Sequence, residues 1–143
     1  MALILFSILS CEKDDICIEA VTPNLIIRFY DIDDSTLLKE IEIDSLWVDG
    51  MDNLYKNVKS DSILVPIDLT KDNTLFKISS NNLEDNFNFT YTRKDVFVSR
   101  SCGYKTIFED LKLESNTSNI LKEVNIINST IDNETAAHIT ILH

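Results

Sequence analysis

Glycine and proline are scarce in this chain of 143 residues, which contains two of each. So few glycines cannot form the glycine-rich loop that holds a nucleotide phosphate, and so few of both residues argue against a flexible interdomain linker. Histidine also occurs only twice, and the three cysteines lack the Cys-x-x-Cys spacing of a structural zinc site. The chain therefore lacks the short motifs of nucleotide-binding and zinc-binding proteins.

Basic residues are few relative to acidic residues: Lys and Arg number 13, Asp and Glu number 24, and the formal net charge is −11. A negative charge of this size repels nucleic-acid phosphates and anionic lipid headgroups, so we expect no nucleic-acid partner. Hydrophobic residues make up 44% of the chain, which is ordinary for a globular protein. The length suits one domain with one core.

An uncharged apolar segment, residues 1–10, precedes Cys11. It is shorter than the roughly 20 residues of a membrane-spanning helix and has the size of the apolar part of a secretory signal peptide. The residues Ile8-Leu9-Ser10-Cys11 resemble the lipobox of bacterial lipoproteins, whose cysteine is acylated and becomes the new N-terminus. This resemblance implies a signal peptide over residues 1–10, lipidation of Cys11 and a membrane partner held through the lipid. A buried N-terminal strand is the alternative.

The other two cysteines are Cys17 and Cys102, an even number if Cys11 carries lipid. Export places thiols where oxidation is favoured, so we predict one disulfide between them. It would close a loop of 102 − 17 = 85 residues. The two Cα atoms should then lie roughly 4.4–6.8 Å apart. Two free thiols in a reducing cytosol are the alternative.

Charged residues follow Cys11 and begin a tether over residues 11–23. Within it, Lys13-Asp14-Asp15 resembles the signal that sends Bacteroidota lipoproteins to the outer face of the outer membrane. The resemblance implies an outer-membrane lipoprotein displayed at the cell surface, with the periplasmic face as the alternative. A plain solvated spacer would have the same composition.

From residue 24 onward, apolar residues recur with the period of two that is typical of β-strands. The expected strands cover residues 25–30, 41–47, 63–69, 76–78, 87–92, 96–99, 104–113, 121–127 and 137–142. Ile41, Ile43 and Trp47 share one parity, which predicts that Trp47 packs in the core, and Pro66 indicates an edge strand.

Asp and Asn take the place of glycine in the expected turns, because their side chains tolerate left-handed backbone. These turns lie at residues 33–34, 49–50, 72–73, 81–82, 116 and 132–133. Short half-apolar strands need a second layer to cover their apolar faces. The sequence therefore predicts an all-β fold: a single antiparallel β-sandwich over residues 24–143, immunoglobulin- or transthyretin-like.

The densest motif is VFVSRSCGYKTIFE, residues 96–109. With Cys17 and the strand containing Pro66, it resembles a family of small uncharacterised Bacteroidota outer-membrane lipoproteins, a domain of unknown function. The resemblance implies a fold and a location but no chemistry. From the residues themselves, we expect a bulge or sharp bend at Cys102-Gly103. We also expect Arg100 and Lys105 to pair with nearby carboxylates.

Candidates for catalysis and metal binding are few. His138 falls on the polar parity of the last strand, where it would be half-exposed, and no Gly-x-Ser-x-Gly elbow accompanies it. Asp31-x-Asp33-Asp34 superficially suggests a calcium loop but lacks the EF-hand spacing, so an acidic hairpin turn is expected. We therefore expect no metal, no cofactor and no enzymatic activity.

Two patterns point to carbohydrate. Ser45 and Ser62 each follow an aspartate and precede an apolar residue, which resembles the acceptor of periplasmic O-glycosylation in Bacteroidota. The aromatic residues Tyr30, Trp47, Tyr91 and Tyr104 could also stack on sugars if the sheet gathers them.

The sequence thus favours a lipid-anchored structural or interaction module of the outer membrane with an envelope protein or glycan as partner. A carbohydrate- or ligand-binding accessory lipoprotein is the alternative. A hydrolase, which would need convergent carboxylates with separated pKa values, is a third.

Overall fold

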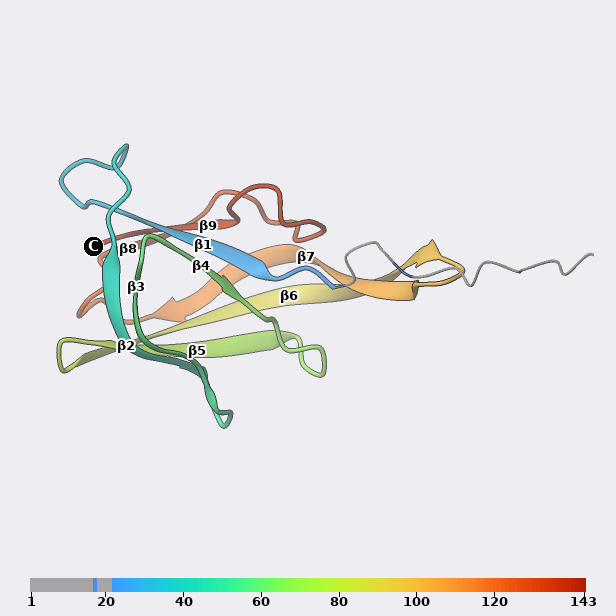
Figure 1. The fold of residues 1–143 in the computed structure, drawn as a ribbon, viewed down its shortest axis with the longest axis horizontal. Helices are drawn as coiled ribbons and strands as arrows, with labels where there is room; N and C mark the ends of the chain where they lie inside the picture. The colour runs from blue at the N-terminus through green and yellow to red at the C-terminus, as the bar shows by residue number, and fades with distance from the viewer. Residues whose placement is uncertain (1–16, 18–21) are drawn as a thin grey trace, which may run out of the picture.

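A computed structural model describes Cys17 and residues 22–143 (Figure 1). The predicted signal peptide, Cys11 and Lys13-Asp14-Asp15 lie outside the described residues. The strands are β1 (Leu25–Tyr30), β2 (Ile41–Val48), β3 (Asn53–Ser60), β4 (Ser62–Val65), β5 (Asn73–Ser80), β6 (Leu83–Ser99), β7 (Gly103–Asn116), β8 (Glu123–Ile126) and β9 (Ile139–Leu142). Within this part of the chain, no helix has the length and apolar character needed to cross a membrane.

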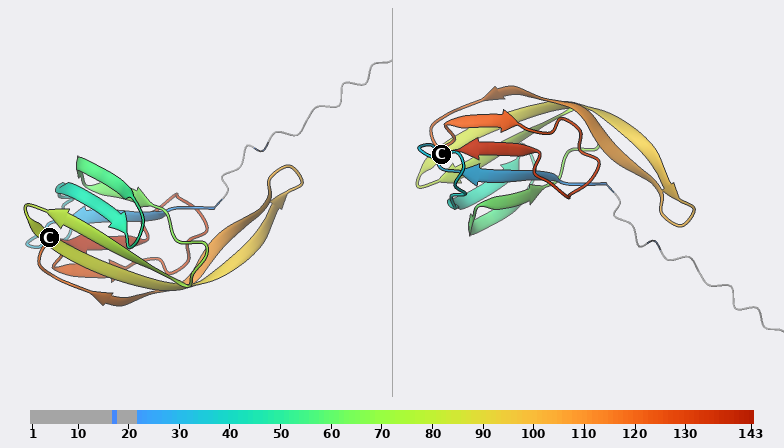
Figure 2. Two further views of the ribbon diagram at one scale, coloured as in Figure 1. Left: turned by 90° about the horizontal axis from the view of Figure 1, so that it is seen from below. Right: turned by 90° about the horizontal axis from the view of Figure 1, so that it is seen from above.

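The strands form two sheets that pack face to face, with the orders β4-β1-β9-β8 and β3-β2-β5-β6-β7 (Figure 2). Neighbouring strands are antiparallel, except that β1 and β9 pair in parallel. The predicted all-β sandwich is therefore confirmed. The finer likeness to immunoglobulin or transthyretin stays a prediction.

The core lies between the sheets and is built by the alternation seen in the sequence. Phe76, Phe87 and Phe89 come from the five-stranded sheet and are at most 1% exposed. The rings of Phe76 and Phe87 stack with centroids 5.3 Å apart. Phe29 and Ile139 face them from the other sheet and are equally buried. Burying each such side chain contributes about 1.5–3 kcal/mol.

Asparagine makes the turn between β5 and β6, as the sequence predicts. Asn81 and Asn82 have φ angles of 50° and 62°, and the flanking residues Ser80 and Leu83 pair across the β5–β6 ladder. Two left-handed residues between paired strands form a type I′ turn, whose twist matches the twist of the strands.

The predicted place of Trp47 in the core is wrong. Ile41 and Ile43 are buried as expected, but Leu46 and Val48 are the next buried residues, and Trp47 is half-buried. The burial alternation changes between Ile43 and Leu46, beside Asn57 of β3, which has a φ of 52°. The β2–β3 ladder also changes register between Leu46 and Trp47. A one-residue irregularity moves later side chains to the other face.

Pro66 follows β4 directly, and β4 is an edge of the four-stranded sheet. This agrees with the edge position that proline indicates. Ile63, Val65 and Ile67 are buried as the alternation predicts, whereas Leu69 is 49% exposed because the strand has already ended.

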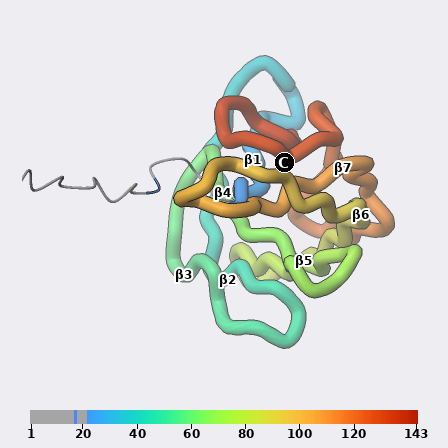
Figure 3. The backbone as a smooth tube through the Cα atoms, turned by 90° about the vertical axis from the view of Figure 1, so that its right-hand side faces the viewer, coloured from blue at the N-terminus to red at the C-terminus, as the bar shows by residue number. Residues whose placement is uncertain are grey.

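The acidic turn predicted after β1 is present, because Tyr30 and Leu38 form an isolated antiparallel bridge and the N–H of Lys39 donates to the carbonyl of Phe29 at 3.0 Å. The loop of residues 31–40 then leads from one sheet to the other. Figure 3, which looks along the long axis from the β6–β7 end, shows this loop and the β2–β3 turn on opposite sides of the molecule.

Candidate functional site

The β6–β7 hairpin extends beyond the rest of the sandwich (Figures 1 and 2). One face of β6 is buried at every second residue from Asp85 to Tyr91, and from Thr92 onward the side chains on both faces are exposed or half-exposed. The ladder to β7 nevertheless continues to Ser99 opposite Gly103. On β7 the last buried residues before the tip are Phe108 and Ile107, so the hairpin beyond them is a two-stranded ribbon without a second layer. Such a ribbon is only marginally stable in water and needs further support.

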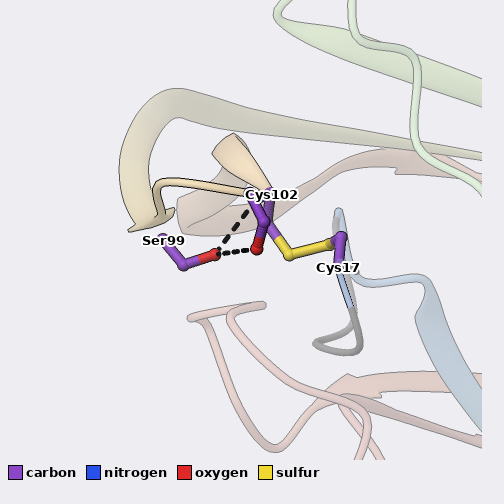
Figure 4. The surroundings of a disulfide bond; sticks show 4 residues. Cys17, Ser99 and Cys102 are labelled. Atoms are coloured by element: carbon purple, nitrogen blue, oxygen red, sulfur yellow. Dashed lines mark hydrogen bonds between the residues drawn. A yellow bond between two sulfur atoms is a disulfide. The ribbon is translucent and has the colours of Figure 1, made fainter. Parts of the chain in front are cut away.

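A disulfide supplies part of that support, because Cys102 in the hairpin turn is bonded to Cys17 (Figure 4). The two Cα atoms are 4.9 Å apart, within the separation predicted from the sequence. The hydroxyl of Ser99 accepts the N–H of Cys102 at 3.1 Å and steadies the turn. A second link lies further along the ribbon, where the N–H of Thr106 donates to the hydroxyl of Thr22 at 3.2 Å.

Gly103 begins β7 with a φ of +71°, a left-handed conformation that glycine adopts without strain. The β6–β7 ladder changes register just before it, between Phe97 and Ser99. The bend predicted at Cys102-Gly103 is therefore present, and the disulfide leaves the ribbon at this bend.

Two large aromatic side chains stand exposed on the ribbon. Phe97 and Tyr104 pair directly across the ladder, and their side chains are 63% and 69% exposed. Their rings meet edge to face with centroids 5.5 Å apart. Adjacent apolar groups left in water at the end of a projecting element are typical of an interaction surface.

In the part of the chain that the structure describes, the cations at the ribbon tip do not meet carboxylates as the sequence predicted. Lys105 Nζ donates to the backbone carbonyl of Asp132 at 3.2 Å. Among the described residues, neither Arg100 nor Lys105 forms an ion pair with a carboxylate. Residues 96–105 contain no acidic side chain, and the neighbouring Asp95 accepts the hydroxyl of Thr106 at 2.7 Å instead.

A cleft of about 500 Å³ lies where the hairpin leaves the sandwich. Its lining residues are Leu69, Asp72, Tyr91, Thr92, Arg93, Asp95 and Thr106. The Arg93 guanidinium donates to Asp72 at 3.1 Å, and the hydroxyl of Thr106 donates to Asp95 at 2.7 Å. The volume suits a small ligand. To bind here, a polar ligand would have to break these internal hydrogen bonds and replace them with its own.

Tyr91 forms the floor of this cleft and fastens the loop that follows β4. Its hydroxyl donates to the carbonyl of Asp68 at 2.8 Å and lies 2.8 Å from the hydroxyl of Thr74. The N–H of Asp68 donates to that same threonine hydroxyl at 3.0 Å, which closes a ring of hydrogen bonds. Burial raises the pKa of Tyr91 above its ordinary value, so the phenol stays protonated at neutral pH.

His138 is buried, not half-exposed as predicted from its parity, and only 1% of its surface is accessible. It lies just before β9. The imidazole Nδ1 accepts the backbone N–H of Ile26 at 3.0 Å, and the backbone N–H of His138 donates to the carbonyl of Ile26 at 3.0 Å. Burial lowers the pKa of His138, although the backbone of Asn133 and nearby carboxylates act in the opposite direction. The prediction failed because a strand parity was extended one residue beyond the strand.

Asp85 is a polar centre that the sequence reasoning missed. Its carboxylate is 1% exposed and accepts the hydroxyl of Thr117 at 2.6 Å. It also accepts the backbone N–H groups of Asn119 and Leu121, both at 2.8 Å, and that of Ile120. Burial alone would raise the pKa of Asp85, but these hydrogen bonds outweigh burial and lower it. The site is structural: it fixes the loop between β7 and β8.

The acidic loop after β1 holds its carboxylates in local turns. Asp31 accepts the N–H of Asp33 at 2.7 Å, and Asp34 accepts the N–H and hydroxyl of Thr36 at 3.0 and 2.6 Å. These bonds lower the pKa of both carboxyl groups. Across Cys17 and residues 22–143, no group of three or more His, Cys, Asp or Glu side chains is arranged to hold a metal ion.

The residues expected to meet carbohydrate are dispersed. Tyr30 and Trp47 lie in different sheets, Tyr91 is 5% exposed, and Tyr104 is on the projecting ribbon. They form no common stacking surface. Ser45 in β2 and Ser62 in β4 are both partly exposed, and their glycosylation stays a prediction.

Comparison with known proteins adds one finding. No curated protein and no solved structure matches the chain. A family model described as "Family of unknown function (DUF6452)" matches residues 32–143, which include all of the sandwich after β1. The chain therefore belongs to this family of unknown function.

Proposed function

We propose that the protein is a lipoprotein, anchored in the outer membrane by acyl chains on Cys11, and that its sandwich acts as a structural or interaction module at the cell surface. The observation that carries this proposal is the bond between Cys17 and Cys102. A disulfide is typical of exported proteins. It also leaves Cys11, directly after the apolar residues 1–10, as the one cysteine of the sequence outside the bond.

The sandwich supports an interaction role more than a chemical one. The hairpin exposes the aromatic side chains of Phe97 and Tyr104, and the polar groups of the adjoining cleft are bonded to one another. An exposed apolar surface at the end of a rigid element suits contact with another surface.

Replacing Cys11 by alanine tests the anchor. We expect Cys11→Ala to keep its first residues and to move from the membrane fraction to the soluble fraction, because no thiol is left to accept lipid before the sandwich. Stable attachment needs more than one acyl chain, which the lipoprotein pathway supplies. Fractionation and the intact mass of the purified protein are the measurements.

The matched control for this variant is Ser10→Ala, which keeps a small residue before the cysteine and should remain lipidated. A Cys11→Ala protein that stays in the membrane fraction, or a wild-type protein whose mass lacks acyl chains, contradicts the proposal.

Surface display is tested separately at Lys13-Asp14-Asp15. Replacing the three residues with alanine is expected to remove protease accessibility in intact cells while membrane attachment persists, because the anchor at Cys11 is untouched. Glu12→Ala, a neighbouring change of charge, is the control and should leave accessibility unchanged. If protease cleaves the triple variant and the wild type equally on intact cells, the three residues are only a spacer.

A further inference from the structure

We propose that the tip of the β6–β7 hairpin, residues 96–105, rests against the membrane that holds the anchor, with the rings of Phe97 and Tyr104 among the lipid headgroups. The inference rests on the proposed lipidation of Cys11. It adds a second contact between this protein and the bilayer, made by the folded domain itself.

The disulfide limits how far the tip can be from the bilayer. It joins Cys102 at the tip to Cys17, which follows Cys11 by 17 − 11 = 6 residues. Six residues span at most about 20 Å when fully extended. The opposite end of β6, at Leu83, lies 97 − 83 = 14 residues from Phe97, roughly 45 Å along the strand. The anchor therefore limits the distance between the tip and the lipid more tightly than the distance of the opposite end.

The side chains at the tip suit the region between water and hydrocarbon. Phe97 and Tyr104 are both more than 60% exposed and lie side by side on one face of the ribbon. Aromatic rings concentrate at the headgroup level of membranes, where the ring leaves water and a hydroxyl can stay hydrated. Here the exposed aromatic pair would leave water without any rearrangement of the sandwich.

The charge of the tip is opposite in sign to that of the chain. Residues 96–105 contain Arg100 and Lys105 and no acidic residue, in a protein of net charge −11. Anionic headgroups attract these two cations. The acidic tether residues Glu12, Asp14 and Asp15, which precede Cys17, act in the opposite direction, so the aromatic pair contributes more to the docking than charge does.

The ribbon is also held in a fixed direction. Its strands remain paired to Ser99 and Gly103, and the links to Cys17 and Thr22 brace it from the N-terminal side. An element braced in this way loses less conformational entropy when its aromatic rings bind than a flexible loop would lose.

Bromolipid quenching of a tryptophan at the tip tests the proposal. The full chain carrying Trp47→Phe and Phe97→Trp is purified from membranes and reconstituted into vesicles of phosphatidylcholine and phosphatidylglycerol, with or without bromine on the acyl chains. We expect bromine to reduce the fluorescence from position 97 by roughly half, because the ring lies within reach of the bilayer. The matched control carries Trp47→Phe and Leu83→Trp, on the same strand at the opposite end, and should not be quenched.

The intact mass of the same sample reports the acyl chains, so a failure of lipidation is distinguished from a failure of docking. An acylated protein whose tryptophans at positions 97 and 83 are quenched equally overturns the docking. The docking is also overturned if the tryptophan at position 97 is not quenched and a photo-crosslinking amino acid at the same position captures an envelope protein in cells. The variant Arg100→Gln with Lys105→Gln should weaken quenching in vesicles that contain phosphatidylglycerol without abolishing it, and unchanged quenching overturns the part assigned to charge.

Discussion

Replacing Asp85 by asparagine is expected to lower the free energy of unfolding by about 3 kcal/mol at neutral pH. The buried carboxylate accepts one hydroxyl and three backbone N–H groups from residues 117–121. Ile120 and Leu121 donate to one carboxylate oxygen, and Thr117 and Asn119 donate to the other. Asparagine has only one amide oxygen, so in either orientation its NH2 group faces at least one backbone N–H that is left without an acceptor. The remaining bonds also lose their charged acceptor, and each such loss costs about 1–3 kcal/mol. Urea unfolding followed by circular dichroism measures the change.

The effect of Asp85→Asn should also depend on pH. The folded state holds the pKa of Asp85 below its ordinary value of 3.8, so the unfolded state binds the proton first as the pH falls. The stability that Asp85 contributes is therefore present above pH 3.8 and is lost as the pH falls through the folded-state pKa. The wild type and the variant should converge in acid.

Asp34→Asn is the matched control, because Asp34 also accepts a threonine hydroxyl and a backbone N–H but does so on the exposed loop. Surface changes of this kind usually stay within about 0.5 kcal/mol. A loss below 1 kcal/mol for Asp85→Asn, or one that persists unchanged in acid, would contradict the role assigned to the carboxylate.

Removing the disulfide is expected to cost about 4 kcal/mol of folding free energy, because the bond closes a loop of 85 residues in the unfolded chain. The double variant Cys17→Ser with Cys102→Ser should unfold at lower urea than the oxidised wild type. Its urea dependence should also be steeper, since an unfolded chain without the crosslink exposes more surface. All variants carry Cys11→Ser, so that no third thiol exchanges with the bond.

The control for the disulfide is reduction. Dithiothreitol should bring the protein with Cys17 and Cys102 to the stability of the double variant and leave the double variant itself unchanged. Equal unfolding midpoints of the oxidised and reduced protein would show that the bond constrains only the tether and not the sandwich.

Much of the sandwich could be predicted because its core strands bury one face. Phe87, Phe89 and Tyr91 alternate with polar residues. Asn81 and Asn82 indicate a turn because asparagine tolerates the positive φ angles that the turn requires. β3 was not predicted, because it is an edge strand whose residues are at least partly exposed along its whole length. A strand that buries little leaves little periodicity to detect.

The candidate site was only partly predictable. The pairing of Cys17 with Cys102 follows from counting cysteines, and the bend at Gly103 follows from glycine. The projection of the hairpin does not, because Val96, Phe97 and Val98 are as apolar as a buried strand. Whether a second layer covers them depends on the length of strands distant in sequence. Asp85 did leave a signal: it shares the parity of Phe87 and Phe89, where a charge must find partners.

The pairing of β1 with β9 has a consequence for the order in which the protein can assemble. These strands come from opposite ends of the domain, residues 25–30 and 139–142, and they are the two central strands of their sheet. His138 joins them through its contacts with Ile26. Such long-range pairing forms late, because the intervening chain must first be brought together. The four-stranded sheet therefore cannot close on a nascent chain until residue 142 has been made, whereas every strand of the five-stranded sheet has been made by residue 116.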